Sequence, residues 1–154
     1  DFQCPACEAY YSILKQVHEK YGNKIQFVYR HFPLSTIHPH AERAAQVAEA
    51  AGKQGKFWEM HDMLFENQSS WSSEGNPDQT FIKYAERLTL DLDRFKKELD
   101  SKEVRGKVTN DSSSGAKLGV QGTPTFFLGG KQLDRNPQSF EEFSEIITNA
   151  LASQ

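Results

Sequence analysis

The sequence contains two cysteines, Cys4 and Cys7, separated by Pro5 and Ala6. They stand where a helical pattern begins. Proline is favoured at the first position of a helix because its missing N–H would have no partner there, so Pro5 predicts that Cys4 lies at the helix start. Cys7 then lies about one turn further along. The two sulfurs should face each other and form a reversible disulfide.

The two thiols should play different parts. The start of a helix carries unpaired N–H groups and the positive end of the helix dipole, and both favour a thiolate over a thiol. We therefore expect Cys4 to be the exposed nucleophile and Cys7 to be the more deeply placed resolving thiol. Asp1 and Glu8 add negative charge nearby, which opposes thiolate formation.

Two other interpretations of the cysteine pair are weaker. A disulfide that closes so short a loop stabilises the fold by about 2 kcal/mol or less in the chain-entropy estimate, so a purely structural bond is not favoured. A zinc site needs four ligands, typically a second cysteine pair or two histidines three to five residues apart. The five histidines include one close pair, separated by a single residue, so we expect no metal: His18, His31, His38, His40 and His61. His61 lies on an apolar helical face, which favours a core histidine with a hydrogen-bond partner.

The composition fits one globular domain that works on proteins or small molecules. A chain of 154 residues can bury about two thirds of its unfolded surface, so its stability does not require the cysteines. The net charge of −3, with acidic and basic residues interspersed, indicates neither a nucleic-acid surface nor a membrane-binding patch. No apolar run approaches the roughly 18 residues of a membrane span. No signal peptide pattern is present either.

Periodicity predicts a helix, a strand and then a long helical section. The apolar residues from Tyr10 to Tyr21 recur at helical spacing, and Gly22 should end this helix in a left-handed conformation. Residues 25–30 are rich in β-branched and aromatic side chains, which predicts a strand that ends before Pro33.

Residues 38–118 show helical patterns only. An alanine-rich face over residues 40–51 permits close helix packing, and a second apolar face covers residues 57–65. The serine-rich residues 68–75 predict a loop. Three further helices are expected: one opened by Asn76 and Pro77, one over residues 92–99, and one from Ser101 that carries Val104, Val108 and Leu118 in phase. Residues 111–115 are poor helix formers, so the end of that last helix is left open.

Strand patterns return near the end of the chain. Residues 124–128 and 131–133 flank Gly129 and Gly130, which can supply the positive φ angles of a tight hairpin turn. Ser139 with Glu142 three residues later is a capping box for a final helix.

This order of elements resembles the thioredoxin-like fold, and the local sequences resemble the DsbA family of disulfide oxidoreductases. The similarity covers essentially the whole chain. The segments that carry it are residues 1–7 around the cysteines, 29–34, 38–41, 55–62, and 119–127 with Gly122-Thr123-Pro124-Thr125. The resemblance implies an α/β fold in which residues 1–37 and 119–154 form the thioredoxin-like domain and residues 38–118 form an all-helical insertion.

The resemblance also implies roles for individual residues. Cys4 and Cys7 would exchange disulfides with protein thiols, and Pro124 would be a cis-proline that faces them. A cis bond there would turn the backbone of Thr123 toward the cysteines, where it could pair with an extended substrate strand. Pro5 and Ala6 would tune the redox potential; strongly oxidising relatives have histidine where this chain has Ala6, which has no donor for the thiolate.

The function expected from these features is a dithiol oxidase that introduces disulfides into exported proteins. It would need no cofactor, and its partners would be protein thiol or disulfide substrates and a redox partner protein. It would work outside the bacterial cytoplasm, in the periplasm or cell envelope, where disulfides persist. A reductase or isomerase of the same fold stays open, because the motif does not set the potential. A glutathione-dependent isomerase is a weaker alternative, because such relatives do not need a residue like Cys7. A non-catalytic binding module is disfavoured by Thr123 and Pro124.

The resemblance raises one structural problem. In this fold a buried strand runs into the cysteine motif and lies between the strand at residues 25–30 and the strand at residues 124–128. Three residues precede Cys4, and they span about 10 Å at most. Without that strand its two neighbours would be separated by roughly 9 to 10 Å and would carry unpaired backbone groups. We therefore expect that the sequence is an N-terminally incomplete form of the domain.

Overall fold

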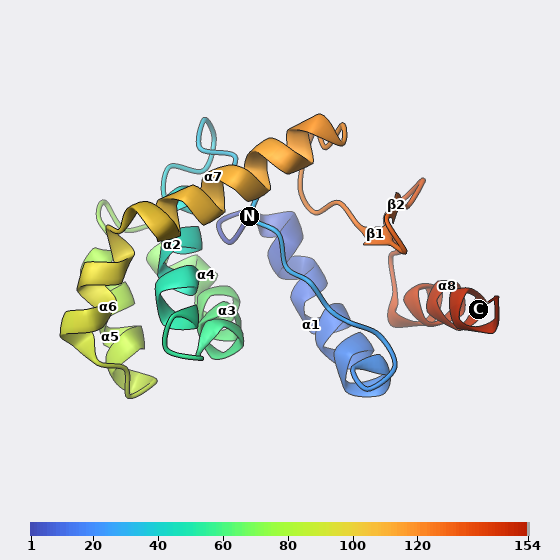
Figure 1. Cartoon of the computed structure of the whole chain (residues 1–154), viewed down its shortest axis with the longest axis horizontal. Helices are drawn as coiled ribbons and strands as arrows, with labels where there is room; N and C mark the ends of the chain where they lie inside the picture. The colour runs from blue at the N-terminus through green and yellow to red at the C-terminus, as the bar shows by residue number, and fades with distance from the viewer. Residues whose placement is uncertain (154) are drawn as a thin grey trace.

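The computed structural model describes residues 1–153, and in this part of the chain it contains eight helices and one two-stranded antiparallel sheet (Figure 1). Helix α1 lies in the middle of an elongated molecule, with the helical section on one side and the hairpin and last helix on the other. In chain order the elements are α1 (Pro5–Tyr21), α2 (Ala41–Gly52), α3 (Phe57–Glu66), α4 (Gln68–Trp71), α5 (Asp78–Arg87), α6 (Leu92–Leu99), α7 (Lys102–Lys117), β1 (Phe127–Leu128), β2 (Lys131–Gln132) and α8 (Phe140–Ala152).

Helix α1 begins at Pro5, as predicted, with Cys4 as its extended N-cap residue. Its buried residues Val17 and Tyr21 pack against Phe143 and Ile147 of α8. The predicted left-handed stop at Gly22 is wrong, because this residue has a φ of −59°. Glycine is required there for another reason: a Cβ atom would lie 2.6 Å from the carbonyl oxygen of His18.

The helical section has its own core. The alanines of α2 are buried, which confirms the predicted small-residue face and lets α3, α6 and α7 pack closely against it. The large buried side chains of this core come from four other helices: Met60, Leu64, Trp71, Phe81 and Phe95. Cys4, Cys7 and Phe2 belong to the same cluster, so the helical section buries the cysteine motif.

Two features of the helical section differ from the predictions, and the structure also gives the helix end that the sequence left open. The expected loop at residues 68–75 contains the single-turn helix α4, because Trp71 is fully buried and its indole N–H donates to the carbonyl oxygen of Leu64 over 2.8 Å. Helix α7 continues through residues 111–115. The buried carboxylate of Asp111 accepts hydrogen bonds from the Arg30 side chain and from the backbone N–H of His31. Leu118 lies beyond the end of α7 and is 64% exposed, so it does not share the buried face of Val104 and Val108.

The C-terminal half of α7 packs closely on the segment that follows residues 25–30. A Cβ atom on Gly115 would lie 2.8 Å from the ring of Phe32 and 3.7 Å from the Cβ atom of Val120. A side chain at this position would therefore separate the helix from the ring. The contact places residues 119–123, which lead to Pro124, beside the loop at Phe32.

The hairpin forms as predicted, with Phe127 opposite Gln132 and Leu128 opposite Lys131. Gly129 and Gly130 have φ angles of 57° and 80°, which only glycine adopts freely at both positions. The strands are shorter than expected, because residues 124–126 lie outside them. Ser139 accepts the N–H of Glu142 as the N-cap of α8, but the Glu142 carboxylate accepts the N–H of Gln138, so half of the capping box forms.

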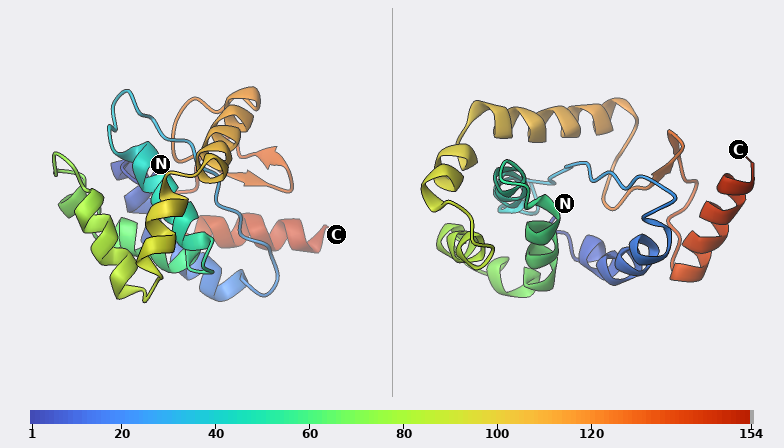
Figure 2. Two further views of the ribbon diagram at one scale, coloured as in Figure 1. Left: turned by 60° about the vertical axis from the view of Figure 1, so that its left-hand side comes forward. Right: turned by 60° about the horizontal axis from the view of Figure 1, so that its bottom comes forward.

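Residues 25–30 are extended but are not part of a sheet in the described chain, so the predicted strand is wrong as a paired element. Exposure still alternates: Phe27 and Tyr29 are partly buried, while Val28 is 59% exposed. The reason is the lack of a neighbour, because within residues 1–153 the sheet contains only the hairpin strands. Figure 2 shows this segment, drawn in light blue, leading from the end of α1 with no strand beside it.

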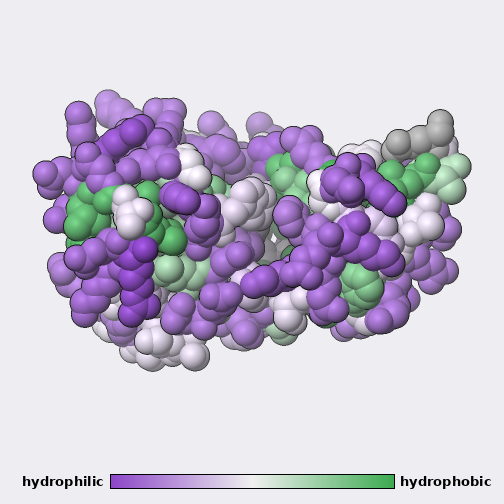
Figure 3. Space-filling view, turned by 90° about the horizontal axis from the view of Figure 1, so that it is seen from below, coloured by the Kyte–Doolittle hydropathy of each residue, from purple (hydrophilic) through white to green (hydrophobic). Residues whose placement is uncertain are grey.

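Hydrophilic residues cover most of the face shown in Figure 3, and apolar residues occur there in separate patches. Within residues 1–153 no helix has the length and apolar character to cross a membrane.

Candidate active site

Cys4 and Cys7 are both free thiols at the start of α1. The expectation that Cys4 would be exposed is wrong: Cys4 is 6% and Cys7 is 8% exposed, so exposure does not distinguish the two. Both residues are covered because the helical section and the loop before Pro124 pack around the motif.

The pKa values distinguish the two thiols. Burial raises the pKa of Cys4, but the nearby Thr123 side chain, the backbone N–H and thiol of Cys7 and the backbone N–H of Ala6 outweigh it, so the pKa lies below its ordinary value. Burial dominates at Cys7 and raises its pKa. The thiolate is thus more stable on Cys4, which agrees with the role expected for a residue at a helix start.

Thr123 lies against Cys4 although the two are far apart in the sequence. The Cys4 thiol donates to the Thr123 carbonyl oxygen over 3.5 Å, and the Thr123–Pro124 peptide bond is cis. The Thr123 hydroxyl is buried and has no hydrogen-bond partner within the described residues. Two side chains fix the loop: Thr125 donates to the carbonyl of Gly122 and Asn136 donates to the carbonyl of Pro124, each over 2.7 Å.

The Asp1 side chain holds the backbone before the helix. One carboxylate oxygen accepts the N–H groups of Gln3 and Cys4 over 2.8 and 3.1 Å, and the other accepts the N–H of Leu34 over 2.9 Å and contacts Nδ1 of His38 over 2.7 Å. From the sequence we expected Asp1 only to add negative charge nearby. Aspartate often accepts the backbone N–H two residues further along in an Asx turn, and this local preference could have indicated the role.

Phe2 anchors the same segment from its apolar side. Its fully buried ring stacks on Tyr29 and tilts against Phe65, with ring centroids 5.0 Å apart in each pair. His61 packs edge-on against Phe2 and contacts the carboxylate of Asp62 over 2.9 Å, as expected of a core histidine with a partner. Within residues 1–153 no three histidine, cysteine or acidic side chains gather as a metal site.

Pro5 and Ala6 are exposed at the start of the helix. The Ala6 side chain ends at a methyl group, so the only donor that this residue gives to the Cys4 sulfur is its backbone N–H. The structure therefore brings Cys4 against Thr123, which precedes Pro124, while Pro5, Ala6 and Cys7 follow Cys4 at the start of α1.

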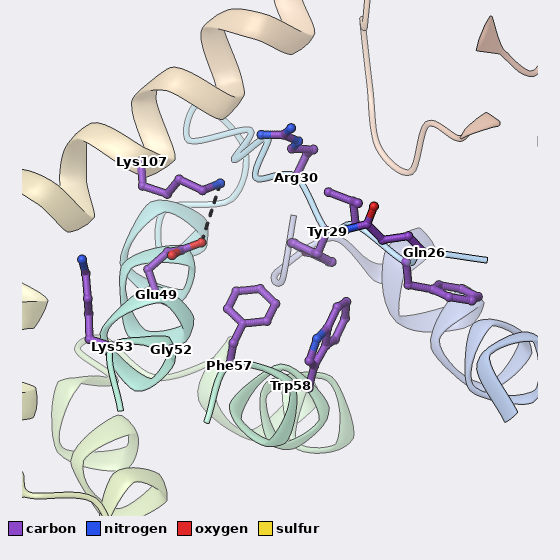
Figure 4. A pocket seen from close by; sticks show the side chains of 11 residues that line it. Gln26, Tyr29, Arg30, Glu49, Gly52, Lys53, Phe57, Trp58 and Lys107 are labelled. Carbon is purple, nitrogen blue, oxygen red and sulfur yellow. Dashed lines mark ion pairs between the residues drawn. The ribbon is translucent and has the colours of Figure 1, made fainter. Parts of the chain in front are cut away.

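A separate hollow of about 540 Å³ lies away from the cysteines, and neither sulfur lines it (Figure 4). It runs along residues 26–30 and is bounded by Phe57 and Trp58 of α3 and by Glu49 of α2. Lys107 of α7 reaches across to Glu49 over 3.9 Å.

Comparisons with known proteins identify the family of the chain. A family model described as thioredoxin matches residues 1–149. The chain belongs to the thioredoxin family.

Among solved structures, DsbA1 of Wolbachia pipientis superposes with a TM-score of 0.81 at 21% identity, covering 99% of this chain and 82% of that one. A thioredoxin-like oxidoreductase of Silicibacter pomeroyi superposes with a TM-score of 0.79 at 23% identity, covering 97% of this chain and 82% of that one. The chain thus has the DsbA-like thioredoxin fold with a helical insertion, as the sequence predicted.

The curated relatives of this thioredoxin-family chain are much longer proteins. It is 39% identical over 153 residues to a protein of Salinispora tropica named Na(+)/H(+) antiporter NhaA 3, covering 99% of the chain and 22% of that protein. It is 40% identical over 152 residues to Na(+)/H(+) antiporter NhaA 1 of Salinispora arenicola, with the same coverage. The chain therefore spans about a fifth of the length of these relatives.

Proposed function

We propose that this chain is a thiol-disulfide oxidoreductase that exchanges disulfides with protein substrates through Cys4 and Cys7, most directly as a dithiol oxidase. The observation that supports this best is the asymmetry of the two thiols beside Thr123: the pKa of Cys4 is lowered and that of Cys7 is raised. A structural disulfide would not require such a difference.

The reaction follows from that asymmetry. A substrate thiolate attacks Cys4 of the disulfide form, the bond between Cys4 and Cys7 breaks, and a mixed disulfide forms. Cys7 leaves as a thiolate and takes up a proton, which its raised pKa favours. A second substrate thiolate then attacks the substrate sulfur and displaces Cys4, whose lowered pKa makes it a good leaving group. Two electrons pass from the substrate to the cysteine pair.

The Thr123 peptide group supplies a site for the substrate backbone. In the dithiol form its carbonyl oxygen accepts the Cys4 thiol. A mixed disulfide has no S–H on Cys4, so this oxygen becomes free to accept a backbone N–H from an extended substrate, as in strand addition. Recognition through the main chain places little demand on substrate side chains.

The proposed direction is oxidation of exported proteins in the periplasm or cell envelope of a bacterium, with a redox partner that reoxidises the pair. A lowered pKa at Cys4 stabilises the dithiol form and makes the disulfide more oxidising. The second candidate is a reductase or isomerase, which Ala6 favours because its side chain has no donor for the thiolate. Two proteins named as antiporters contain a similar segment, and we propose that this segment contributes redox chemistry, because it carries the cysteine pair beside Thr123.

We also propose the division of the chain into a thioredoxin-like part, residues 1–37 and 119–154, and an insertion, residues 38–118. Two separate clusters support it: α1 packs with α8 in one, while the insertion helices pack in the other. The motif residues Cys4 and Cys7 join the insertion cluster, so the active site lies where the two parts meet.

The deciding experiment is the equilibrium of the Cys4–Cys7 pair with glutathione buffers. A potential of about −120 to −200 mV supports the oxidase, and one near −270 mV supports the reductase. The Cys7→Ala variant separates the remaining alternative, because a glutathione-dependent isomerase would keep its activity without this thiol. A pair that forms no reversible disulfide would refute the proposed function.

A further inference from the structure

Gln68 is a buried side chain of the helical insertion that reaches the redox motif. Only 8% of this residue is exposed, and its side-chain amide nitrogen donates to the carbonyl oxygens of Phe2 and Cys4 over 2.8 and 3.0 Å. A buried amide that gives both of its N–H groups to two carbonyls of one short segment restricts that segment strongly.

The base from which Gln68 extends is itself fixed. Helix α4 is a single turn, and it is anchored by Trp71, which is fully buried and donates to the Leu64 carbonyl. Asn67 donates from its side chain to the carbonyl of Met63 over 2.8 Å, which joins α4 to the end of α3. Gln68 therefore has little freedom to move away from the motif.

The Cys4 backbone is held at both of its polar groups. Its N–H donates to the Asp1 carboxylate over 3.1 Å, and its carbonyl accepts from Gln68 and from the N–H of Glu8, the first hydrogen bond of α1. Cys4 is thereby kept at φ −72° and ψ 121°, the extended conformation of an N-cap residue. Its side chain leaves this fixed backbone toward Thr123.

We infer that Gln68 is a positioning residue of the redox site, through which the helical insertion holds Cys4 at the start of α1 with its sulfur against the Thr123 carbonyl. The N–H groups at the start of a helix stabilise a thiolate only where the sulfur lies close to them. Without the amide the segment from Phe2 to Cys4 loses two hydrogen bonds, and its carbonyls become free to turn. Through Gln68 the helical insertion therefore positions Cys4 as well as burying it. The inference rests on the proposed function for its biological meaning.

The test replaces Gln68 with Met, which keeps a similar volume and removes both donors. We expect the pKa of the Cys4 thiolate to rise and its alkylation rate at mildly acidic pH to fall about threefold to tenfold, the scale of one lost hydrogen bond. Gln46→Met is the matched control. Gln46 is also 8% exposed, but its side-chain hydrogen bonds join it to the side chains of Arg43 and Glu42 and not to the redox motif. An unchanged Cys4 pKa in folded Gln68→Met would overturn the inference.

A measurement on the unaltered protein covers the case in which Gln68→Met does not fold. The side-chain amide signals of Gln68 in NMR spectra should shift between the dithiol and disulfide forms, while those of Gln46 should not. Identical Gln68 signals in the two forms would contradict the inference. Neither measurement uses a protein substrate. Failure of this inference is therefore distinguishable from failure of the proposed function, which fails if the pair does not exchange disulfides with proteins.

Discussion

The Sγ atom of Cys4 lies 3.5 Å from the carbonyl oxygen of Thr123, a residue 119 positions further along the chain. This contact joins the start of α1 to the loop before Pro124 and places the substrate-pairing peptide group beside the reactive sulfur. The chemistry proposed above depends on it, because attack at Cys4 and capture of the substrate backbone must occur at one place.

The two thiols should react in a fixed order. In the dithiol form at mildly acidic pH we expect alkylation of Cys4 to be about tenfold or more faster than that of Cys7, because the pKa of Cys4 is lowered and that of Cys7 is raised. Mass spectrometry after brief labelling measures the order. With a disulfide-bonded protein as the probe, Cys7→Ala should trap a mixed disulfide, because the Cys4 thiolate attacks the substrate disulfide, one substrate sulfur leaves as a thiolate, and no Cys7 thiol is present to release Cys4. Cys4→Ala should trap none, and faster labelling of Cys7 would reverse the assigned roles.

Ala6→His should lower the pKa of Cys4 further and make the disulfide more oxidising, because an imidazole can donate to the thiolate or stand charged beside it. Thiolate absorbance titration and the glutathione equilibrium measure both effects. Ala9→His is the control, since Ala9 is also exposed on α1 but lies outside the motif. If the pKa of Cys4 does not fall, Ala6 is not a tuning position.

Asp111 should make the stability of the chain depend on acid. Burial raises the pKa of its carboxyl, but hydrogen bonds from Lys107, Arg30 and the N–H of His31 outweigh burial and lower the pKa. A lowered folded-state pKa stabilises the fold above the unfolded-state pKa of about 4, and this contribution is lost as the pH falls through the folded-state value.

Asp111→Asn tests this linkage. At pH 7 the variant should be less stable by about 1 kcal/mol, a small value because Lys107 and Arg30 are partly exposed. The difference from the unaltered chain should shrink below about pH 4, where both chains lack the charge. Denaturant unfolding across the pH range measures it, and a difference that stays constant down to pH 2 would show that the charge of Asp111 does not contribute.

Gly115→Ala should destabilise the chain by about 1 to 3 kcal/mol, because its Cβ atom would lie 2.8 Å from the Phe32 ring. Gly106→Ala is a matched control in the same helix: nothing lies within 4 Å of a Cβ atom there. It should stabilise the chain by about 0.5 to 1 kcal/mol through helix propensity alone. Thermal melts compare the two, and equal effects would mean that the contact with Phe32 is unimportant.

The backbone of residues 26–30 makes no backbone hydrogen bonds within the described chain. This segment is therefore an unpaired edge to which a β-strand can add. The amides of Val28 and Tyr29 should exchange with solvent far faster than those in the middle of α2. Slow exchange at both positions in a monomeric, cooperatively folded sample would contradict the unpaired edge.

Local sequence determined most of the helices and the chemistry of the motif. Pro5 after Cys4 was sufficient to place the start of α1, because a proline at the first turn is a local property of the backbone. The hairpin turn at Gly129 and Gly130 and the cap at Ser139 also depend on neighbours within a few residues. Such features need no knowledge of the rest of the fold.

Contacts between distant residues decided what the sequence analysis missed. Trp71 forms a buried helical turn in a serine-rich stretch because burial of an indole outweighs local propensity. Residues 25–30 have the composition of a strand, but a strand also needs a partner, and the described chain provides none there. The positions of Asp1 and Gln68 around Cys4 likewise arise only when the insertion packs on the motif. The sequence by itself thus identified a reactive cysteine pair at a helix start. The tertiary structure decided which buried groups surround Cys4, because hydrogen bonds between remote segments form only after packing has brought those segments together.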